Sequence, residues 1–346
     1  MLLSTSATVF AEDSSKVVNS ENIEQIQKAD SEYNIQKKKV SEVLSDVNQS
    51  VVAIIGENAN YKTDTDYEYS KYPQNLQHGS GVIIEDGGKI LTNNHVIDGV
   101  KDIYVVTYDG NVYKAQLLYT DKQIDLALLK INRTDLKPIK LAKENEVTVG
   151  DEVVAIGTPL SFGYRNSAST GIVSGLNRPV DDIYTYLQTD ASINPGNSGG
   201  PLVNMLGELV GINTLGYTFY DGVNFSIPVG NINYFLDHYK KFGRIKRCFT
   251  GIELEENWAA MLGIPTNQGL KVVTIKKNAV VTASDVKEGD TLEAIDNKAV
   301  TSISQYNEIL KGHLPGDKVT MTFMRNNKKF TLSVTLKEQP DEKSSK

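Results

Sequence analysis

The chain has 346 residues, which is long enough for two or three domains of ordinary size. Hydrophobic residues make up 40% and charged residues 23% of it, a balance typical of a soluble globular protein rather than a disordered or membrane-embedded one. The net charge of −7 gives no general attraction to nucleic acid or anionic lipid, and no nucleic-acid motif occurs, so no nucleic-acid partner is expected. The single cysteine, Cys248, excludes an internal disulfide framework and a cysteine-based zinc cluster.

Residues 1–38 are expected to form a signal-like start and a polar tether. The first fifteen residues read MLLSTSATVFAEDSS, in which an apolar stretch is followed by small residues and then by Glu12 and Asp13. This order resembles the end of a secretory signal and favours export, although the basic start of such a signal is missing. A frayed terminus is the alternative. A missing upstream segment would be either a cleaved signal or an anchor, so a membrane tether stays open.

The next part of the chain has the pattern of a β-rich domain. VSEVLSDVNQSVVAII is typical of a short amphipathic helix that runs into an apolar strand. A tyrosine-rich polar stretch at residues 58–77 indicates a long exposed loop. From Gly79 to Pro228, short β-like segments are punctuated by glycine and aspartate, with hairpin turns at Asp86-Gly87 and Asp109-Gly110. Strands at such even spacing predict a sandwich or barrels, here one barrel on each side of about residue 140.

The C-terminal part has a different composition. A helix, VGNINYFLDHYKKFG, leads into a basic linker at residues 237–247, which is either a solvated hinge near a helix C-terminus or a phosphate or lipid patch. Residues 248–338 have the pattern of a small α+β domain, with a hairpin turn at Asn326-Asn327. The tail, residues 339–346, is expected to be disordered.

One loop carries a candidate nucleophile. Residues 189–204 read TDASINPGNSGGPLVN, in which Ser198 stands among glycines between Pro195 and Pro201. The run cannot be a helix interior and is too broken for an ordinary strand. It is either a plain tight turn or a loop whose backbone N–H groups point at a reacting atom. An activated serine also needs a base within hydrogen-bond reach and a third group that orients the base.

The chain offers few bases. Of its four histidines, His95 in LTNNHVI stands at the end of an apolar strand, where a catalytic side chain can be held in place; the others are His78, His238 and His313. Asp125 in QIDLALLKI leads into a buried strand, and a carboxylate there is costly unless it has a partner. Taken alone, Asp125 is equally consistent with a residue that simply starts a strand. With Ser198 in the second β-unit, a site formed by these three residues would lie between the two units.

The glycines around Ser198 then have a chemical purpose. Gly196, Asn197 and Ser198 can present backbone N–H groups to the oxyanion of a tetrahedral intermediate, and Gly196 gives the loop its conformational freedom.

TNNHVI, DLALLKI and QTDASINPGNSGGPLVN, in this order and spacing, resemble the HtrA/Deg family of chymotrypsin-fold serine proteases. VSEVLSDVNQSVVAI, STGIVSG and VNFSIPV are also similar to that family, and the resemblance covers roughly residues 40–338. It implies a mainly β protein: two antiparallel six-stranded β-barrels of the trypsin/chymotrypsin type in a protease domain at residues 39–236, followed by a small α+β PDZ domain at 248–338. It also implies that the chain forms a homotrimer.

The resemblance assigns roles residue by residue. His95 is implied as the general base, Asp125 as the residue that orients it, and Ser198 as the nucleophile. Gly196 and Ser198 are implied as the main oxyanion-hole donors. No cofactor or metal is implied, because no ATP-binding loop and no metal-ligand cluster occurs in the sequence.

The expected peptide-binding residues of the PDZ domain are Phe249, Thr250, Gly251 and Ile252, which match the family's carboxylate-binding loop. The family more often has a larger aliphatic residue in place of Thr250, and ASDVKEGDTL replaces the commoner AGLxxGDxI. A PDZ domain takes up C-terminal peptides by adding a strand to a sheet edge. The departures put the peptide preference in doubt, and a domain that acts only as a spacer is the alternative.

Substrate preference is expected to be aliphatic. A trypsin-like pocket would have an acid six residues before the nucleophile, where this chain has Ser192. Ile193, Thr214, Leu215 and Gly216 are the expected pocket residues, and they favour a small or medium aliphatic P1 residue. Because such residues are buried in folded proteins, the expected substrates are unfolded or misfolded polypeptides.

The sequence therefore predicts an ATP-independent, extracytoplasmic serine endopeptidase of protein quality control. Two other functions stay open: a chaperone or PDZ adaptor with little proteolysis, and a processing protease dedicated to one substrate.

Overall fold

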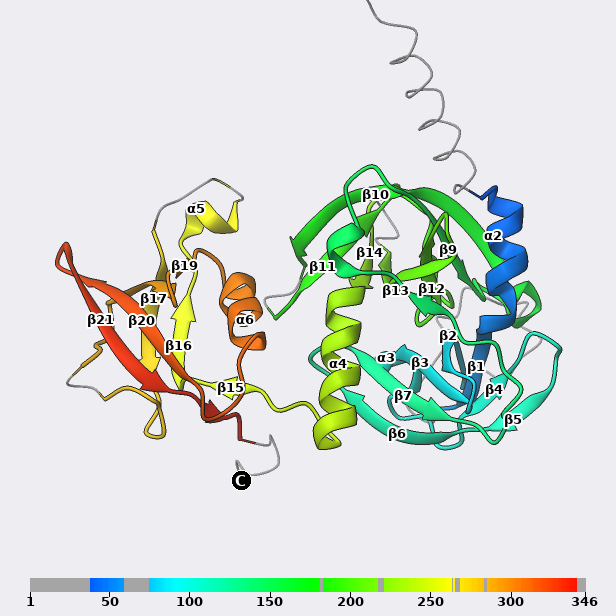
Figure 1. Ribbon diagram of the computed structural model, residues 1–346, viewed down its shortest axis with the longest axis horizontal. Helices are drawn as coiled ribbons and strands as arrows, with labels where there is room; N and C mark the ends of the chain where they lie inside the picture. The colour runs from blue at the N-terminus through cyan, green and yellow to red at the C-terminus, as the bar shows by residue number, and fades with distance from the viewer. Residues whose placement is uncertain are drawn as a thin grey trace, which may run out of the picture.

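The computed structural model describes residues 38–58, 75–180, 183–216, 221–262, 264, 268–282 and 285–340. The signal-like start, most of the tyrosine-rich stretch and most of the C-terminal tail lie outside the described residues, so these expectations stay predictions. The described chain forms two neighbouring β-units and a smaller C-terminal domain, and helix α4 (Val229–Phe242) lies on the side of the β-units that faces this domain (Figure 1).

The first β-unit is a curled antiparallel sheet with the strand order β5-β4-β1-β2-β3-β7-β6. Its strands are β1 (Val51–Glu57), β2 (Leu76–Glu85), β3 (Lys89–Asn93), β4 (Tyr104–Val106), β5 (Val112–Lys114), β6 (Gln116–Asp121) and β7 (Leu126–Lys130). β5 and β6 do not pair, because only Ala115 separates them and a hairpin turn takes at least about two residues. The N–H of Ala115 donates instead to Ile103 O at 2.8 Å. The expected closed six-stranded barrel is therefore an open seven-stranded sheet.

The second β-unit is a closed six-stranded barrel, as predicted. Its strands are β9 (Glu152–Gly157), β10 (Ser167–Pro179), β11 (Thr185–Thr189), β12 (Pro201–Asn204), β13 (Glu208–Gly216) and β14 (Asn224–Pro228), and the two-residue β8 (Lys140–Leu141) adds in parallel to β13. β12 pairs with both β9 and β13, which closes the barrel. The predicted mainly β fold class is thus confirmed.

Helices pack against the two β-units. The described helical segments are α2 (Val40–Val47), η1 (Asn48–Ser50), α3 (Asn94–Ile97), η2 (Glu144–Glu146), η3 (Phe162–Tyr164), α4, α5 (Trp258–Met261) and α6 (Ile303–Lys311). α2 and α4 bury Val43, Val47 and Phe235 in one apolar cluster that joins both sheets. α4 ends at Gly243 in the left-handed conformation (φ +73°), so it runs across the expected boundary at residue 236. None of the described helices combines the length and apolar character needed to cross a bilayer.

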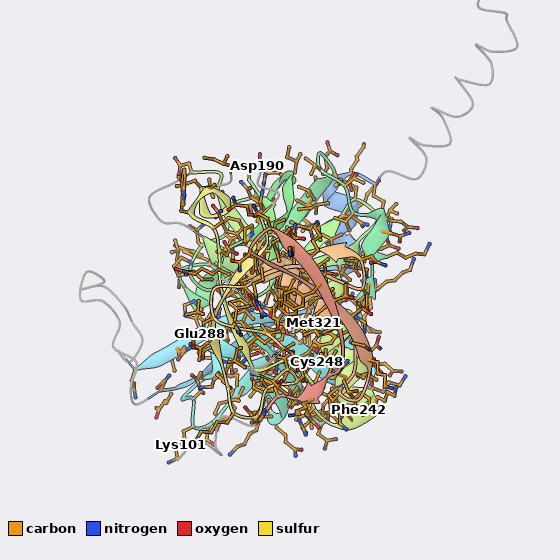
Figure 2. The ribbon with its side chains drawn as sticks, turned by 90° about the vertical axis from the view of Figure 1, so that its left-hand side faces the viewer. Lys101, Asp190, Phe242, Cys248, Glu288 and Met321 are labelled. Atoms are coloured by element: carbon orange, nitrogen blue, oxygen red, sulfur yellow. The ribbon has the colours of Figure 1, made fainter. Side chains whose placement is uncertain are left out.

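The C-terminal domain is a small α+β unit with its own core. Its main sheet has the order β16-β17-β18-β20-β21, which leaves β16 as an edge strand. The strands are β15 (Cys248–Phe249), β16 (Ile252–Glu255), β17 (Leu270–Ile275), β18 (Thr291–Ile295), β19 (Lys298–Ala299), β20 (Lys318–Arg325), β21 (Lys328–Thr335) and β22 (Lys337–Glu338). Figure 2 faces this domain, and the labelled Met321 lies fully buried in its core. The predicted turn at Asn326-Asn327 has positive φ at both residues.

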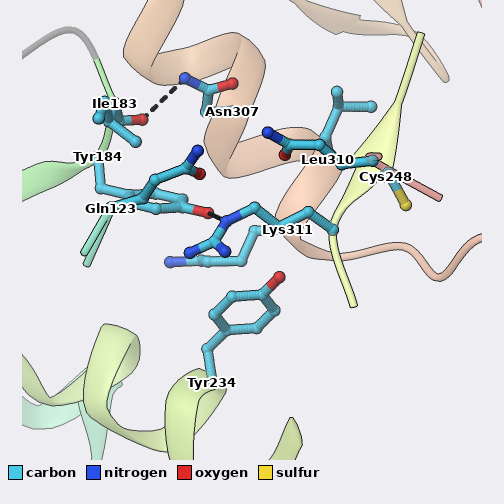
Figure 3. A pocket seen from close by; sticks show the side chains of 10 residues that line it. Gln123, Ile183, Tyr184, Tyr234, Cys248, Asn307, Leu310 and Lys311 are labelled. Carbon is cyan, nitrogen blue, oxygen red and sulfur yellow. Dashed lines mark hydrogen bonds between the residues drawn. The ribbon is translucent and has the colours of Figure 1, made fainter. Parts of the chain in front are cut away.

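Polar contacts join α6 to the segment before β11 and to α4. Asn307 Nδ2 donates to Ile183 O at 2.9 Å, and Lys311 Nζ donates to Asn231 Oδ1 at 2.5 Å. A cavity of about 210 Å³ lies between the C-terminal domain and the β-units with α4, and Tyr184, Tyr234 and Leu310 are among its lining residues (Figure 3).

Candidate active site

His95 and Asp125 form a hydrogen-bonded pair at the edge of the first β-unit. His95 Nδ1 lies 2.7 Å from Asp125 Oδ2, and the backbone N–H of His95 donates to Asp125 Oδ1 at 2.9 Å. The side chain of His95 is 46% exposed and that of Asp125 is 21% exposed. Because a carboxylate only accepts hydrogen bonds, this contact places a ring proton on Nδ1, and in the neutral imidazole Nε2 is then the acceptor.

The backbone explains why these two side chains meet. β3 ends at Asn93, so α3 turns His95 out of the sheet immediately after the strand. The N–H of Asn94 and the Nδ2 of Asn93 both donate to the carbonyl of Asp125, at 3.0 and 2.9 Å. Asp125 itself has φ +58°, a conformation that aspartate tolerates better than most residues. These contacts hold the strained backbone of Asp125 in place and so keep its carboxylate beside the imidazole.

Ser198 joins the same site through Thr214. The Oγ of Ser198 donates to Thr214 O at 3.2 Å, and Thr214 Oγ1 donates to Asp125 Oδ2 at 3.0 Å. In the described part of the chain, Ser198 Oγ has no hydrogen bond to His95. The three residues predicted as a triad are therefore gathered in one place, with the serine hydroxyl turned to Thr214.

The loop before Ser198 presents free backbone donors. The carbonyl of Pro195 accepts a hydrogen bond from the N–H of Leu160 at 2.7 Å. In a planar trans peptide the C=O and N–H point in opposite directions, so the N–H of Gly196 points away from Leu160. Among the described residues, the N–H groups of Gly196 and Ser198 have no partner. The N–H of Asn197, by contrast, donates to Asn194 O at 2.9 Å, so in this conformation Asn197 is not available as the oxyanion donor that the sequence suggested.

Ser80, which the sequence reasoning missed, holds this loop against the first β-unit. Its backbone N–H donates to Ser198 O at 2.8 Å and its Oγ donates to Gly196 O at 2.8 Å. The same Oγ accepts from Thr158 N at 2.9 Å. A small residue between glycines in HGSGV was the available signal, but its partners lie more than 75 residues away in the sequence, which no local pattern encodes.

The expected substrate pocket is only partly described. Ile193 and Thr214 are buried, and Gly216 is exposed at the end of β13. Leu215 lies in β13, but its side chain is outside the described part of the structure. Asn224, at the start of β14, was missed by the sequence analysis and lies directly opposite Gly216 in the strand pairing.

The structure gathers the four expected peptide-binding residues in one turn that leads to the edge strand. Phe249 ends β15, Gly251 has φ +73°, and Ile252 starts β16. Thr250 is buried, and its Oγ1 lies 2.5 Å from the hydroxyl of Tyr306 on α6. The N–H of Ile252 donates to Thr250 Oγ1 at 3.3 Å, so one of the expected carboxylate donors is engaged inside the domain.

Cys248, the single cysteine of the chain, lies in β15. Burial raises the pKa of its thiol to about 12, with a smaller contribution from the negative charge of Asp317. Because the thiolate is the reactive form, this cysteine is not suited to nucleophilic catalysis near neutral pH.

Comparison with known proteins agrees with both parts of the fold. Residues 79–212 match the model of a trypsin-like peptidase domain, and residues 250–336 match that of a PDZ domain. The peptidase match includes all three residues of the candidate triad. The C-terminal domain is therefore a PDZ domain.

Named relatives point in the same direction. A probable periplasmic serine endoprotease, DegP-like, from Pseudomonas savastanoi is 36% identical over 272 residues, which are 76% of this chain and 56% of the relative. The serine protease Do-like HtrB of Bacillus subtilis is 33% identical over 290 residues, 77% of this chain and 63% of that protein. The chain thus spans somewhat over half the length of these curated relatives.

Solved structures extend the likeness to three dimensions. The serine endoprotease from Yersinia pestis has a TM-score of 0.66 and 31% identity, and the alignment covers 88% of this chain and 99% of that one. The HtrA-type protease AlgW with a tripeptide has a TM-score of 0.72 and 28% identity over similar shares. With a trypsin-like domain, a PDZ domain and a relative matched over almost its whole length, the chain belongs to the HtrA/DegP family of serine proteases.

Proposed function

We propose that the chain is an ATP-independent serine endopeptidase that cleaves unfolded or misfolded polypeptides after small or medium aliphatic residues. The observation that carries the proposal is the chain of contacts from His95 through Asp125 and Thr214 to Ser198. The names of the relatives, which are serine endoproteases, also support the proposal.

In this proposal Ser198 attacks the scissile carbonyl and His95 Nε2 takes its proton. Asp125 holds His95 in the tautomer that leaves Nε2 free and stabilises the imidazolium that forms. For this step the Ser198 hydroxyl has to turn from Thr214 O toward His95. The N–H groups of Gly196 and Ser198 then bind the oxyanion, because they have no other partner among the described residues and the loop sets their direction in advance.

The PDZ domain is proposed to bind peptides with a free C-terminus. β16 is an edge strand, so its open side can pair with an added peptide strand. The HtrA-type protease AlgW was solved with peptides, which supports a peptide ligand here. Polar contacts between α6 and residues 183–185 would let a bound peptide act on the protease domain.

The remaining assignments are proposals of the same kind. The domain limits at residues 39–236 and 248–338, the linker at 237–247 and a homotrimer all rest on the family resemblance. An extracytoplasmic location is supported by relatives named as periplasmic.

Proteolysis of reduced casein tests the proposal. The chain and its Ser198→Ala variant would be compared, each with and without a peptide that ends in a free hydrophobic C-terminus. We expect cleavage that is lost in the variant and is stimulated by the peptide. Absence of cleavage under every condition, with aggregation of the casein still suppressed, would instead favour a chaperone or adaptor. Cleavage restricted to a single site of a single substrate would favour a dedicated processing protease.

A further inference from the structure

Asn224 occupies a position that bears directly on the candidate substrate pocket. It is the first residue of β14 and pairs with Gly216, the last residue of β13. Residues that face each other in an antiparallel pair project their side chains to the same face of the sheet. The amide of Asn224 therefore projects onto the face on which Gly216 has no side chain.

The contacts of Asn224 show which space the amide fills. The Nδ2 donates to Ala191 O at 3.0 Å, and Oδ1 lies 2.9 Å from the point where a Cβ on Gly216 would stand. The same point lies 2.4 Å from Ile193 O. The amide thus fills the space between the end of β13 and the segment that contains Ala191 and Ile193. Two of the expected pocket residues, Ile193 and Gly216, stand on these two sides.

This side chain is held firmly. Asn224 is only 7% exposed, and moving its amide aside would break the hydrogen bond to Ala191 O and leave two buried polar groups without partners. In the described residues, Oδ1 of Asn224 has no hydrogen-bond donor, so an acceptor is left for a substrate. A large apolar side chain pressed against that oxygen would bury it unpaired, whereas a small or hydroxyl-bearing one would not.

We propose that Asn224 determines the P1 specificity of the chain, by closing the inner end of the pocket beside Ser198 so that the pocket takes Ala, Ser, Thr or Val and excludes Leu, Met and Phe. The inference rests on the proposed endopeptidase function and specifies the substrate class of that site. A single methylene in an enzyme pocket typically changes discrimination by roughly 10–200-fold, so one amide at the base of the pocket is enough to impose this limit.

The test is a set of peptides that differ only at P1, carrying Ala, Thr, Val, Leu, Met or Phe. The kcat/KM for each peptide would be measured for the unmodified full chain, for Asn224→Gly and for Asn224→Ala. We expect the unmodified chain to prefer the first three peptides by at least about tenfold. Both variants are expected to gain at least about tenfold on Leu and Met relative to Ala, with the glycine variant also accepting Phe.

Ser226→Ala is the matched control. Ser226 lies two residues along on β14, is fully buried, and its Oγ donates to Asn213 Oδ1 at 3.2 Å. General loosening of β14 would widen the P1 profile in this control as well, and that result would overturn the proposal. Thermal unfolding verifies that each variant is folded. If Asn224→Gly is not folded, the peptide profile of Asn224→Ala tests the proposal.

Two further results would also overturn the proposal: an unmodified chain that cleaves after Leu and Phe as readily as after Ala, or a profile that both Asn224 variants leave unchanged. A different result marks failure of the proposed function itself. If the unmodified chain and Ser198→Ala are equally inactive on every peptide and on reduced casein, the endopeptidase assignment falls and the P1 inference falls with it.

Discussion

Thr214 donates its hydroxyl to Asp125 at 3.0 Å, and the oxygen that accepts it, Oδ2, is the one bound by His95 Nδ1. The same Thr214 accepts the Ser198 hydroxyl through its carbonyl. One residue of the second β-unit therefore holds the acid of the first unit and also contacts the candidate nucleophile. The position of the acid depends on how the two units pack.

Thr214→Val is expected to lower kcat/KM by about tenfold, equivalent to about 1.4 kcal/mol, because Asp125 loses one of its three donors and orients His95 less well. Steady-state kinetics on a peptide substrate would measure the change. Thr214→Ser, which keeps the hydroxyl, should stay within about twofold of the unmodified chain. A loss in Thr214→Ser as large as that in Thr214→Val would show that the hydrogen bond to Asp125 does not explain the effect.

The contacts of Thr214 show where prediction from the sequence reaches its limit. Short motifs sufficed to propose His95, Asp125 and Ser198, because each stands at a strand end or in a glycine-rich loop with a recognisable composition. Alternating apolar segments likewise sufficed for the mainly β class. Such patterns carry a period but not a register, so they do not reveal that Gly216 faces Asn224.

The same limit explains why the sequence predicts neither the open first sheet nor the free donors of the oxyanion loop. Whether β5 and β6 close a barrel depends on the path of Ala115 and not on strand propensity. Which N–H groups of the loop are free depends on the distant partners Leu160 and Ser80, more than 30 and 110 residues from Ser198 along the chain. The sequence suggested three neighbouring donors, and the packing leaves the N–H groups of Gly196 and Ser198 without a partner among the described residues.

Gly196→Ala is expected to reduce kcat/KM by about 100–1,000-fold, because the loop would have to shift and lose an oxyanion donor. Gly196 has φ +99°, and a Cβ there would stand 2.1 Å from Thr158 O. Gly110→Ala is the matched control: Gly110 also has positive φ (+84°), but no atom of the described residues lies within 4 Å of the added carbon. The control should cost about 1 kcal/mol of stability and leave activity unchanged. Similar kinetic losses in both variants would contradict the oxyanion role of Gly196.

Arg247→Met is expected to destabilise the protein by about 3–5 kcal/mol, because it leaves a buried charge unpaired. Arg247 donates two hydrogen bonds of 2.6 and 2.7 Å to the carboxylate of Asp121, and these side chains are 14% and 7% exposed. Asp121 Oδ1 also accepts the N–H groups of Gln123 and Ile124, at 3.1 Å each. Urea unfolding would measure the free energy.

Asp121→Asn in the Arg247→Met background removes the orphaned charge but keeps an oxygen for the two N–H groups. The double variant should therefore recover most of the lost stability. A single variant that costs less than about 1 kcal/mol, or a double variant no more stable than the single one, would show that the pair is not a buried ion pair of this kind.

Acid is expected to destabilise the fold through His78, whose Nε2 lies 2.8 Å from the point where a Cβ on Gly196 would stand. Burial lowers the pKa of His78 below its usual value of 6.5, against a smaller opposing effect of the Thr158 backbone. As the pH falls below about 6.5, the imidazole of the unfolded chain binds a proton before that of the folded chain does. The stability of the fold is therefore complete above this pH and declines as the pH falls toward the lowered pKa of the folded state. His78→Leu should therefore show a smaller decline in Tm between pH 7 and pH 5. His238, whose pKa burial also lowers, has the same sign and keeps some decline in both proteins. Parallel curves of Tm against pH would contradict the role of His78.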